Sequence, residues 1–381
     1  MEISLLVIVV IATALIFDFT NGFHDTANAM ATSIATGALR PKVAVAISAV
    51  LNLAGAFLSV EVAKTISSGI VEDTQITPAV IFGGLVGAIM WNLVTWFAGL
   101  PSSSSHALFG GLIGAAWIAA GSDAVHFGKI VEKVVVPAIA SPVIAGLVSL
   151  LATYLSYRIT RNADPRSVSK GFKYGQTVTA CMVSLAHGTN DAQKTMGVLT
   201  LTLVSAGMLP SQSTPPLWVI LSAGFAMALG TYMGGWRVIR TLGKGLTDLD
   251  SSQGFAAETS AATTLLVSSN LGFALSSTQV CSGSVVGVGL GRRLSNVRWG
   301  VAGKMATAWL LTLPAAGIVG AVSSEITTLG PVGVAAVAVV AAAIGLGIYL
   351  ASRRDPVTPS NVNDAPAAAE RAPEPAMATT S

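Results

Sequence analysis

The segment Asn21-Gly22-Phe23-His24-Asp25-Thr26-Ala27-Asn28-Ala29-Met30 places a cluster of polar side chains in an otherwise apolar stretch of the chain. A related segment follows at His187-Gly188-Thr189-Asn190-Asp191-Ala192-Gln193-Lys194-Thr195-Met196. Gly22 to Met30 aligns with Gly188 to Met196 without a gap, at an offset of 166 residues. Each segment surrounds an Asp with Gly, Asn and Thr, so the chain contains an internal duplication from which the fold can be inferred.

A second pair of segments repeats in the same order. Leu100-Pro101-Ser102-Ser103-Ser104-Ser105-His106 is matched by Ala274-Leu275-Ser276-Ser277-Thr278-Gln279, at an offset of 173 residues. Each is followed by two glycines four residues apart in an apolar stretch. Duplicated halves of this size are typical of secondary transporters. Whether the halves are inverted stays open at this point, because the number of helices in each half is not determined by the motifs.

The composition indicates a membrane protein. Of the 381 residues, 52% are hydrophobic and only 10% are charged, and the mean hydropathy is +0.70. Soluble domains usually carry about 25% charged residues. The composition therefore excludes a soluble enzyme, a nucleic-acid-binding protein and a disordered scaffold, and it predicts an all-α polytopic membrane protein. Cys181 and Cys281 lie in apolar context and indicate neither a disulfide framework nor a metal cluster.

Continuous apolar runs predict about ten to twelve transmembrane segments, the first of them a retained helix rather than a signal peptide. Arg and Lys gather in a few loops, above all at 158–173. By the positive-inside rule, this loop and the C-terminus are cytoplasmic. The predicted organisation is a first repeat at 1–157, a basic cytoplasmic linker at 158–173, a second repeat at 174–352 and a disordered tail at 353–381.

The acids at matched positions are the strongest functional candidates. An ionised side chain in the centre of the membrane costs at least ~2.5–3.5 kcal/mol, so it indicates a function by default. Gly22 and Gly188 predict broken helices that expose backbone groups beside Asp25 and Asp191. Carboxylate, Asn and Thr oxygens suit Na⁺, and an Asp can alternatively take a proton. The competing structural interpretation is that both acids merely cap broken helices.

Other ionisable residues also fall in apolar context and are predicted to be buried. Glu258 begins an apolar helix, and Glu61 lies one turn from Lys64, with which it can pair. Lys194 follows Asp191 by three residues and could neutralise it or contact an anion. His187 shares a helical face with Asp191, but two ligands are too few to predict a divalent-metal site.

The serine-rich segments suit an anion. Pro101 ends one helix and the serines begin the next, where Ser and Thr are favoured caps. A helix N-terminus presents free N–H groups and a positive dipole end, so it binds anions. Together with the hydroxyls, these groups predict a donor-rich site for a tetrahedral oxyanion. The short apolar stretches behind both segments predict re-entrant half-helices.

All four segments resemble the motifs of the inorganic phosphate transporter (PiT) family. Residues Asn21 to Thr32 and Ala186 to Gly197 resemble its paired signatures, and the serine-rich segments resemble its Pro-x-Ser-Thr-Thr-His hairpin motif. The resemblance covers about residues 1–352. It implies a low-affinity, cation-coupled phosphate symporter of the bacterial Pit type, built from two inverted halves.

The resemblance also implies roles for individual residues. The coupling cation is expected at Asp25, Asn28, Asn190 and Asp191. Phosphate is expected at the hairpin hydroxyls Ser103, Ser104, Ser105, Ser276, Ser277 and Thr278, to which we add Gln193 and Thr195 of the second motif. A Glu that begins the helix before the second hairpin is also important in the family, and here it is Glu258.

The sequence departs from the family pattern in three places. His24 stands where eukaryotic members have Asn, and because His titrates near neutrality, a proton path through His24 and Glu258 is an alternative to Na⁺ coupling. Ala274 and Gln279 replace the Pro and the His of the second hairpin, so the two anion-binding segments are not equivalent. The long cytoplasmic loop of eukaryotic members is replaced by the short basic loop 158–173.

The sequence thus predicts a secondary active transporter that imports inorganic phosphate across the bacterial cytoplasmic membrane by H⁺ or Na⁺ symport with alternating access. The expected partners are phosphate, the coupling cation and the lipid bilayer. We expect no nucleic acid, no cofactor and no enzymatic activity, and we leave open whether the protein forms a homo-oligomer.

Sulfate or a metal–phosphate complex is the alternative cargo. A channel or an anion receptor is disfavoured by the duplication and the buried acids. A serine hydrolase built on Ser102–Ser105 and His106 is a distant alternative, because the Gly-x-Ser-x-Gly elbow is missing and the second copy lacks the His.

Overall fold

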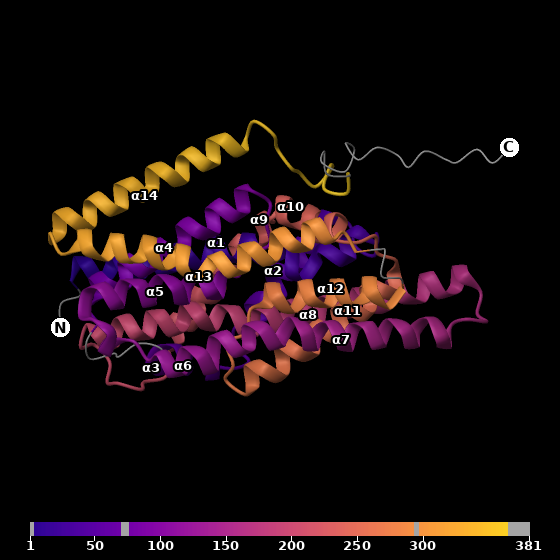
Figure 1. Ribbon diagram of the computed structural model, residues 1–381, viewed down its shortest axis with the longest axis horizontal. Helices are drawn as coiled ribbons and strands as arrows, with labels where there is room; N and C mark the ends of the chain where they lie inside the picture. Colours follow the sequence, from indigo (N-terminus) through magenta and orange to yellow (C-terminus); the bar gives the residue numbers. More distant parts are fainter. Residues whose placement is uncertain (1–3, 70–75, 293–296, 365–381) are drawn as a thin grey trace.

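The computed structural model describes residues 4–69, 76–292 and 297–364, and the regular structure within these residues is helical. Figure 1 shows an elongated bundle of helices, which confirms the predicted all-α class. Large apolar side chains such as Ile139, Leu310 and Val339 are exposed, whereas many acids, amides and hydroxyls are buried. An apolar exterior around a polar centre is the arrangement expected for a protein that faces lipid.

Two long helices carry the repeated Asp motifs through the middle of the bundle. They are α1 (Leu5–Ala35) and α8 (Pro165–Ser205), and they pack against each other. Ser4 and Asp164 cap their N-termini by accepting hydrogen bonds from backbone N–H groups of the first turn. At 1.5 Å per residue, the 41 residues of α8 extend over roughly 60 Å.

Both motif helices are continuous, which corrects the prediction that they break at Gly22 and Gly188. The glycines allow close helix packing instead. A Cβ on Gly22 would lie 2.3 Å from the carbonyl oxygen of Met227 in α9 (Leu217–Met233). A Cβ on Gly188 would lie 2.2 Å from the carbonyl oxygen of Asn52 in α2 (Pro41–Gly55). The polar side chains of the motifs therefore project from the sides of intact helices.

The serine-rich segments form the tips of two helical hairpins. The first consists of α4 (Pro78–Phe97) and α5 (Ser104–Ala120), and the second of α11 (Ser251–Asn270) and α12 (Ser277–Arg292). α5 and α12 are only 17 and 16 residues long and begin at buried serines, as predicted for half-helices. In Figure 1, α5 lies towards the left of the bundle and α12 towards the right. The tips meet between them, where Ser105 Oγ donates to the carbonyl of Leu275 at 3.4 Å.

The remaining long helices connect the two predicted repeats. α2 packs on α8, and α9 packs on α1. α7 (Val136–Ile159) packs on the second hairpin, and α13 (Trp299–Thr327) packs on the first. The two halves thus have matching patterns of neighbours, and each half contributes two helices that pack on the other, while their inversion stays a prediction. The shorter elements are α3 (Glu61–Gly69), η1 (Ser122–Ala124), α6 (Phe127–Ile130), η2 (Val131–Val135), α10 (Trp236–Arg240) and η3 (Thr241–Gly245).

Among the described residues, five helical segments are long and apolar enough to cross a membrane. They are α1, α4, the continuous stretch 127–159, α13 and α14 (Pro331–Ser352), and a sixth arises if α9 and the stretch 236–245, which meet at 62°, count as one bent span. The ten to twelve segments counted from the sequence also include shorter helices such as α2, α5 and α12. They further include α8 and α11, which carry many buried polar side chains. Protein rather than lipid surrounds these polar stretches, so their backbone and side-chain polar groups can form hydrogen bonds within the protein.

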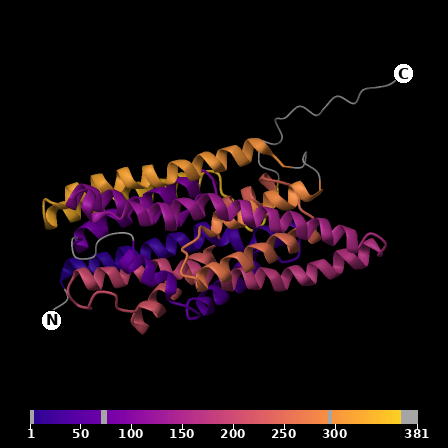
Figure 2. The same ribbon diagram turned by 60° about the horizontal axis from the view of Figure 1, so that its bottom comes forward.

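α14 lies along the upper edge of the bundle in Figure 1, and Figure 2 shows the same elongated bundle turned by 60°. Only 6% of the most apolar stretch of α14 is buried. The tail that follows is predicted to be disordered from residue 353, but it has defined contacts up to residue 364. Arg240 donates to the carbonyl of Asn361 at 2.9 Å, and Val362 is buried. A basic side chain and one apolar residue thus hold this part against the bundle. Residues 365–381 of the predicted tail lie outside the described residues.

Candidate functional site

The two repeated Asp motifs meet at the centre of the bundle. Ligand atoms of Asp25, His187 and Asp191 all lie within 4.8 Å of one another, and the three side chains are buried. The fold thus combines the two matched acids into one site. The polar residues of the motifs and the hairpin hydroxyls around them are at most 5% exposed, so the site is closed to both sides of the protein in this structure.

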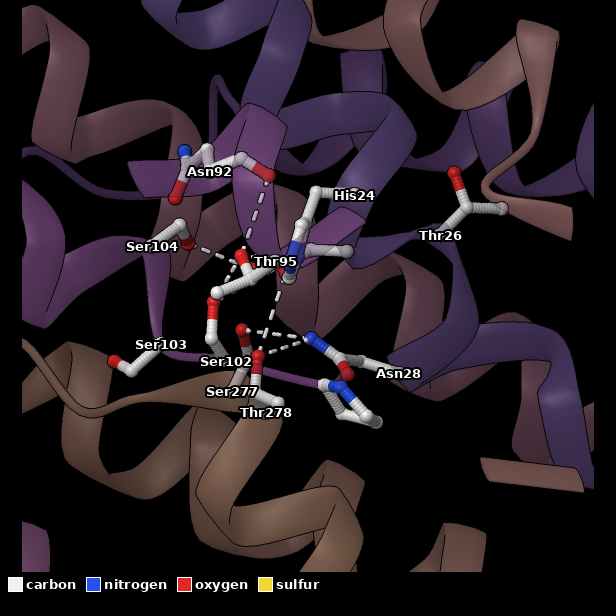
Figure 3. Close-up of polar contacts among 12 residues, drawn as sticks. His24, Thr26, Asn28, Asn92, Thr95, Ser102, Ser103, Ser104, Ser277 and Thr278 are labelled. Carbon is white, nitrogen blue, oxygen red and sulfur yellow. Dashed lines mark hydrogen bonds and ion pairs between the residues drawn. The ribbon is translucent and has the colours of Figure 1, made fainter. Parts of the chain in front are cut away.

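Asp25 is held by groups from α1 and from both hairpin tips. Its Oδ1 accepts hydrogen bonds from His24 Nδ1 at 2.7 Å and from Thr278 Oγ1 at 3.3 Å. Its Oδ2 accepts from Ser104 Oγ at 2.7 Å. Asn28, one turn further along α1, donates its amide to Ser277 and Thr278 at 3.3 and 3.0 Å (Figure 3). The first motif therefore connects the two hairpins.

Asp191 is also surrounded by donors, but its partners differ from those of Asp25. Its Oδ1 accepts from Asn190 Nδ2 at 2.6 Å and from the buried ammonium of Lys194. Its Oδ2 accepts from Ser277 Oγ at 2.9 Å and lies 3.1 Å from His187 Nε2. Lys194 thus neutralises Asp191, which is one of the two roles predicted for it. The two halves of the site are not equivalent, because a lysine accompanies only the second acid.

His24 connects Asp25 to a chain of hydroxyl groups. Its Nε2 lies 3.2 Å from Thr95 Oγ1 in α4 and 3.4 Å from Ser102 Oγ, and the two hydroxyls are 2.7 Å apart. Figure 3 shows Thr95 and Ser102 beside the first hairpin tip. Such a chain could relay a proton, so the arrangement is compatible with the predicted proton path through His24, which stays a prediction.

Two of the predicted phosphate ligands cap their own helices. Ser103 Oγ accepts from the backbone N–H of His106 at 3.2 Å, and Ser276 Oγ accepts from that of Gln279 at 3.3 Å. In Figure 3, the hydroxyl of Ser103 points away from Asn28. Since both oxygens already satisfy N–H groups of the first helical turn, their first structural role is to begin α5 and α12 at these positions.

Three other hairpin hydroxyls contact the acids directly. Ser104 and Thr278 donate to Asp25, and Ser277 donates to Asp191. A hydroxyl has a single hydrogen to donate. In this structure these hydroxyls therefore donate their hydrogen bonds to the carboxylates. They can donate to an anion only when another partner, such as a cation, contacts the carboxylates instead.

Glu258 lies in a second polar cluster, towards the C-terminal end of α1. Its Oε1 accepts from Thr32 at 2.5 Å, Ser33 at 2.6 Å and Gln176 at 3.2 Å. Its Oε2 accepts from Thr179 at 2.7 Å. Thr32 follows Asp25 by seven residues, so this cluster lies roughly 10 Å along the helix from the central site. It joins α1, α8 and α11.

Within the described part of the chain, Gln193 has its hydrogen-bond partners away from the hairpin tips, and Thr195 has none there. Gln193 Oε1 accepts from the N–H groups of Val62 at 2.8 Å and Ala63 at 3.2 Å, and its amide donates to α8 itself. Both ends of this side chain are used, and one of them caps α3. Thr195 lies beside Asp18. Neither position indicates a contact with an anion at the hairpin tips.

Glu61 is the predicted buried acid that the structure places at the surface. The side chains of Glu61 and Lys64 are 50% and 42% exposed and form an ion pair at 2.7 Å. The predicted pairing is confirmed, whereas the predicted burial is wrong. The apolar residues that follow along α3 suggested burial, but these two side chains lie on the face of the short helix that is not covered.

Sequence reasoning missed Asp18, which is fully buried. Asp18, Asn21, Asp25 and Asn28 follow one another at intervals of three, four and three residues, which places them on one face of α1. This spacing was an available signal for a polar face that extends beyond the motif. Thr95 carried no comparable signal, because single hydroxyl residues are common in apolar helices.

Comparisons with known proteins agree with these observations. The family model described as "Phosphate transporter family" matches residues 21–320. A "Probable low-affinity inorganic phosphate transporter" of Mycobacterium leprae (strain TN) is 54% identical over 368 residues, which cover 96% of this chain and 89% of the relative. A protein of the same description from Bacillus subtilis (strain 168) is 40% identical over 321 residues, covering 84% and 96%. The solved structure of "The sodium-dependent phosphate transporter" has a TM-score of 0.77 and 26% identity, and the match covers 86% of this chain and 100% of that one.

Proposed function

This chain belongs to the phosphate transporter family, and we propose that it imports inorganic phosphate by symport with a cation, H⁺ or Na⁺, through alternating access. Like the other members it is a transporter rather than an enzyme, and a multi-pass integral protein of the plasma membrane. One observation carries the proposal: Asp25 accepts hydrogen bonds from a hydroxyl of each hairpin tip, and Asp191 accepts one from the second tip. A cation site and an anion site are thereby in direct contact.

The buried charges support a cation as the second cargo. Among the described residues, the buried ionisable side chains are four acids, one lysine and three histidines. With all four acids ionised and the histidines neutral, the acids exceed the lysine by three negative charges, and phosphate adds further negative charge. Moving charge across the membrane also costs about 2.3 kcal/mol per charge per 100 mV. Cations that travel with phosphate offset both costs. The buried groups are Asp18, Asp25, Asp191, Glu258, Lys194, His24, His106 and His187.

The hydroxyl contacts suggest how the two cargoes are coupled. Ser104, Ser277 and Thr278 donate their single hydrogens to carboxylates. A cation bound by the Asp and Asn oxygens of the motifs satisfies the carboxylates in their place. The hydroxyls can then turn to phosphate, which also meets the free N–H groups at the starts of α5 and α12. In this proposal the cation binds first and prepares the anion site.

Alternating access is supported by where the site lies. Its residues are almost completely buried, so neither side of the membrane reaches them in this structure. Each hairpin contributes one tip to the site and is covered by a helix of the other half. Movement of one hairpin at a time could therefore open the site to one side while the other tip keeps it closed.

A neutral metal–phosphate complex is a second candidate cargo. Asp25, His187 and Asp191 bring two carboxylates and an imidazole within 4.8 Å, a donor set that suits a divalent cation. The ammonium of Lys194 opposes this role, because it already contacts Asp191 and would lie close to the metal. Symport with a monovalent cation is therefore the primary proposal.

The test is uptake of ³²P-labelled phosphate by the purified protein in proteoliposomes, with Na⁺ and pH gradients imposed separately. Accumulation driven by one gradient supports symport and identifies the coupling ion. Uptake that depends on Mg²⁺ and disappears with EDTA supports the metal–phosphate complex instead. Excess sulfate should leave uptake unchanged. Phosphate that only equilibrates under every gradient contradicts symport and indicates a channel.

A further inference from the structure

Asp18 differs from the other buried acids in its surroundings. Asp25, Asp191 and Glu258 each accept several hydrogen bonds from side chains. Asp18 is also fully buried, yet neither of its carboxylate oxygens has a hydrogen-bond partner in the described part of the chain. Burying a charged group without a partner is costly. Either a proton or a bound cation must therefore neutralise this carboxylate in the interior.

More unpartnered oxygens lie next to this carboxylate. Asn21, one turn along α1, and Thr195 of α8 are the polar side chains beside Asp18. Both are fully buried, and neither the amide of Asn21 nor the hydroxyl of Thr195 has a hydrogen-bond partner among the residues described. Two carboxylate oxygens, one amide oxygen and one hydroxyl oxygen are thus left for a ligand. Oxygen atoms of these kinds are the ligands that hard cations prefer.

The local charges favour a monovalent cation. Lys194 and Asp191 are the charged groups that act on Asp18, and they form a buried ion pair with each other. The charges of this pair cancel, which leaves the negative charge of Asp18. One monovalent cation neutralises it, whereas a divalent cation would leave a positive charge near the ammonium of Lys194.

We propose that Asp18, Asn21 and Thr195 form a further Na⁺ site, distinct from the cation ligands of the two motifs. The inference rests on the proposed function and deepens it. Asp18 precedes Asp25 by seven residues, so the site lies roughly 10 Å along α1 from the central acids and on the same helix face. The position that matches Asp18 in the second half is Ser184, at the offset of 166 residues, so the repeat supplies no second copy. The site makes cation binding asymmetric between the halves.

Binding of ²²Na⁺ to the purified full-length protein, at constant pH and without phosphate, tests this site. Asp18→Asn removes the charge at nearly constant volume and is expected to bind one Na⁺ fewer per molecule. Thr195→Val removes one oxygen and is expected to weaken Na⁺ binding at this site about tenfold. Thr200→Val is the matched control, because Thr200 is equally buried on α8 but donates to the carbonyl of Met196 in its own helix.

Three results would overturn the site: no Na⁺ binding by the wild type, an unchanged Na⁺ count in Asp18→Asn, or a Thr195→Val protein that binds Na⁺ like Thr200→Val. Thermal unfolding shows whether each variant is folded, and if Asp18→Asn is not, the comparison of the two threonine variants decides. Phosphate uptake by the wild type is measured in parallel. Gradient-driven uptake combined with an unchanged Na⁺ count in Asp18→Asn refutes the site and leaves the proposed function intact. Wild-type protein that binds Na⁺ at Asp18 but takes up no phosphate refutes the function alone.

Discussion

The contact between Lys194 and Asp191 shows how single residues keep charge inside this protein. Lys194 is fully buried and donates to Asp191. We expect Lys194→Met to destabilise the protein by about 3–5 kcal/mol, because removing one partner leaves a buried charge uncompensated. The double variant Asp191→Asn/Lys194→Met should recover most of this stability but not transport. Thermal unfolding in detergent and phosphate uptake measure the two effects. If the Lys194→Met variant unfolds at the same temperature as the wild type, His187 and the other neighbours of Asp191 compensate its charge without Lys194.

The hairpin hydroxyls allow a second prediction at the scale of single residues. Ser104 and Ser277 donate to the two central acids and are proposed to donate to phosphate after the cation binds. Ser104→Ala and Ser277→Ala should each raise the half-saturating phosphate concentration about tenfold, as expected for the loss of one hydrogen bond to a charged group. Ser268→Ala is the control, because this buried hydroxyl donates only within α11. If all three variants have the same half-saturation, the hydroxyls do not hold phosphate.

Single residues could be predicted from the sequence where repetition marked them. Asp25 and Asp191 stand out because an acid recurs at matched positions in an apolar chain, and the structure brings both into one site. Gln193 shows why the contacts of other site residues could not be predicted from the sequence. It lies within the motif, but its partners are N–H groups at the start of α3, about 130 residues away in the chain. Such a partner depends on tertiary packing, which no local pattern encodes.

At the scale of helices, the glycines of the motifs lead to a third prediction. A Cβ at Gly22 would lie 2.3 Å from a backbone oxygen of α9, and one at Gly188 would lie 2.2 Å from a backbone oxygen of α2. Backbone cannot move aside as a side chain can, so Gly22→Ala and Gly188→Ala should each destabilise the protein by about 1–3 kcal/mol through overpacking. Gly303→Ala in α13 is the control, because a Cβ there meets no atom within 4 Å. Equal thermal stability of all three variants would contradict this packing role.

The same glycines explain where helix prediction from sequence succeeded and failed. The starts of α5 and α12 could be predicted, because a serine cap is a local device whose partner lies three residues away. The breaks predicted at Gly22 and Gly188 were wrong, because glycine weakens a helix but also allows another helix to approach closely. Only the neighbouring helix decides between the two uses. In α1 and α8 that neighbour is α9 and α2, respectively, and both helices continue.

At the scale of the whole molecule, the two halves depend on each other. The hairpin of each half is covered by a helix from the other, and the acids of both halves accept hydrogen bonds from neighbouring hydroxyls of the second tip. The predicted boundaries between repeats could be drawn from the motifs, but this exchange of helices could not, since it depends on long-range contacts. Because the central site draws on both halves, its charge balance is a property of the complete protein.

This charge balance leads to the last prediction. At the central site the two acids Asp25 and Asp191 outnumber the lysine Lys194 by one, so phosphate enters a centre that already carries excess negative charge. A cation should therefore raise phosphate affinity, by about 5–150-fold if the coupling has the usual size of 1–3 kcal/mol. Calorimetric titration of the solubilised protein with phosphate, at constant pH in Na⁺ or in choline, measures the effect, and a second pair of titrations at lower pH measures it for H⁺. Thermodynamic linkage requires that phosphate raise the affinity for the same cation by the same factor. If phosphate affinity is independent of both cations, the hydroxyls are not released by cation binding, and the coupling must arise from the movement of the hairpins instead.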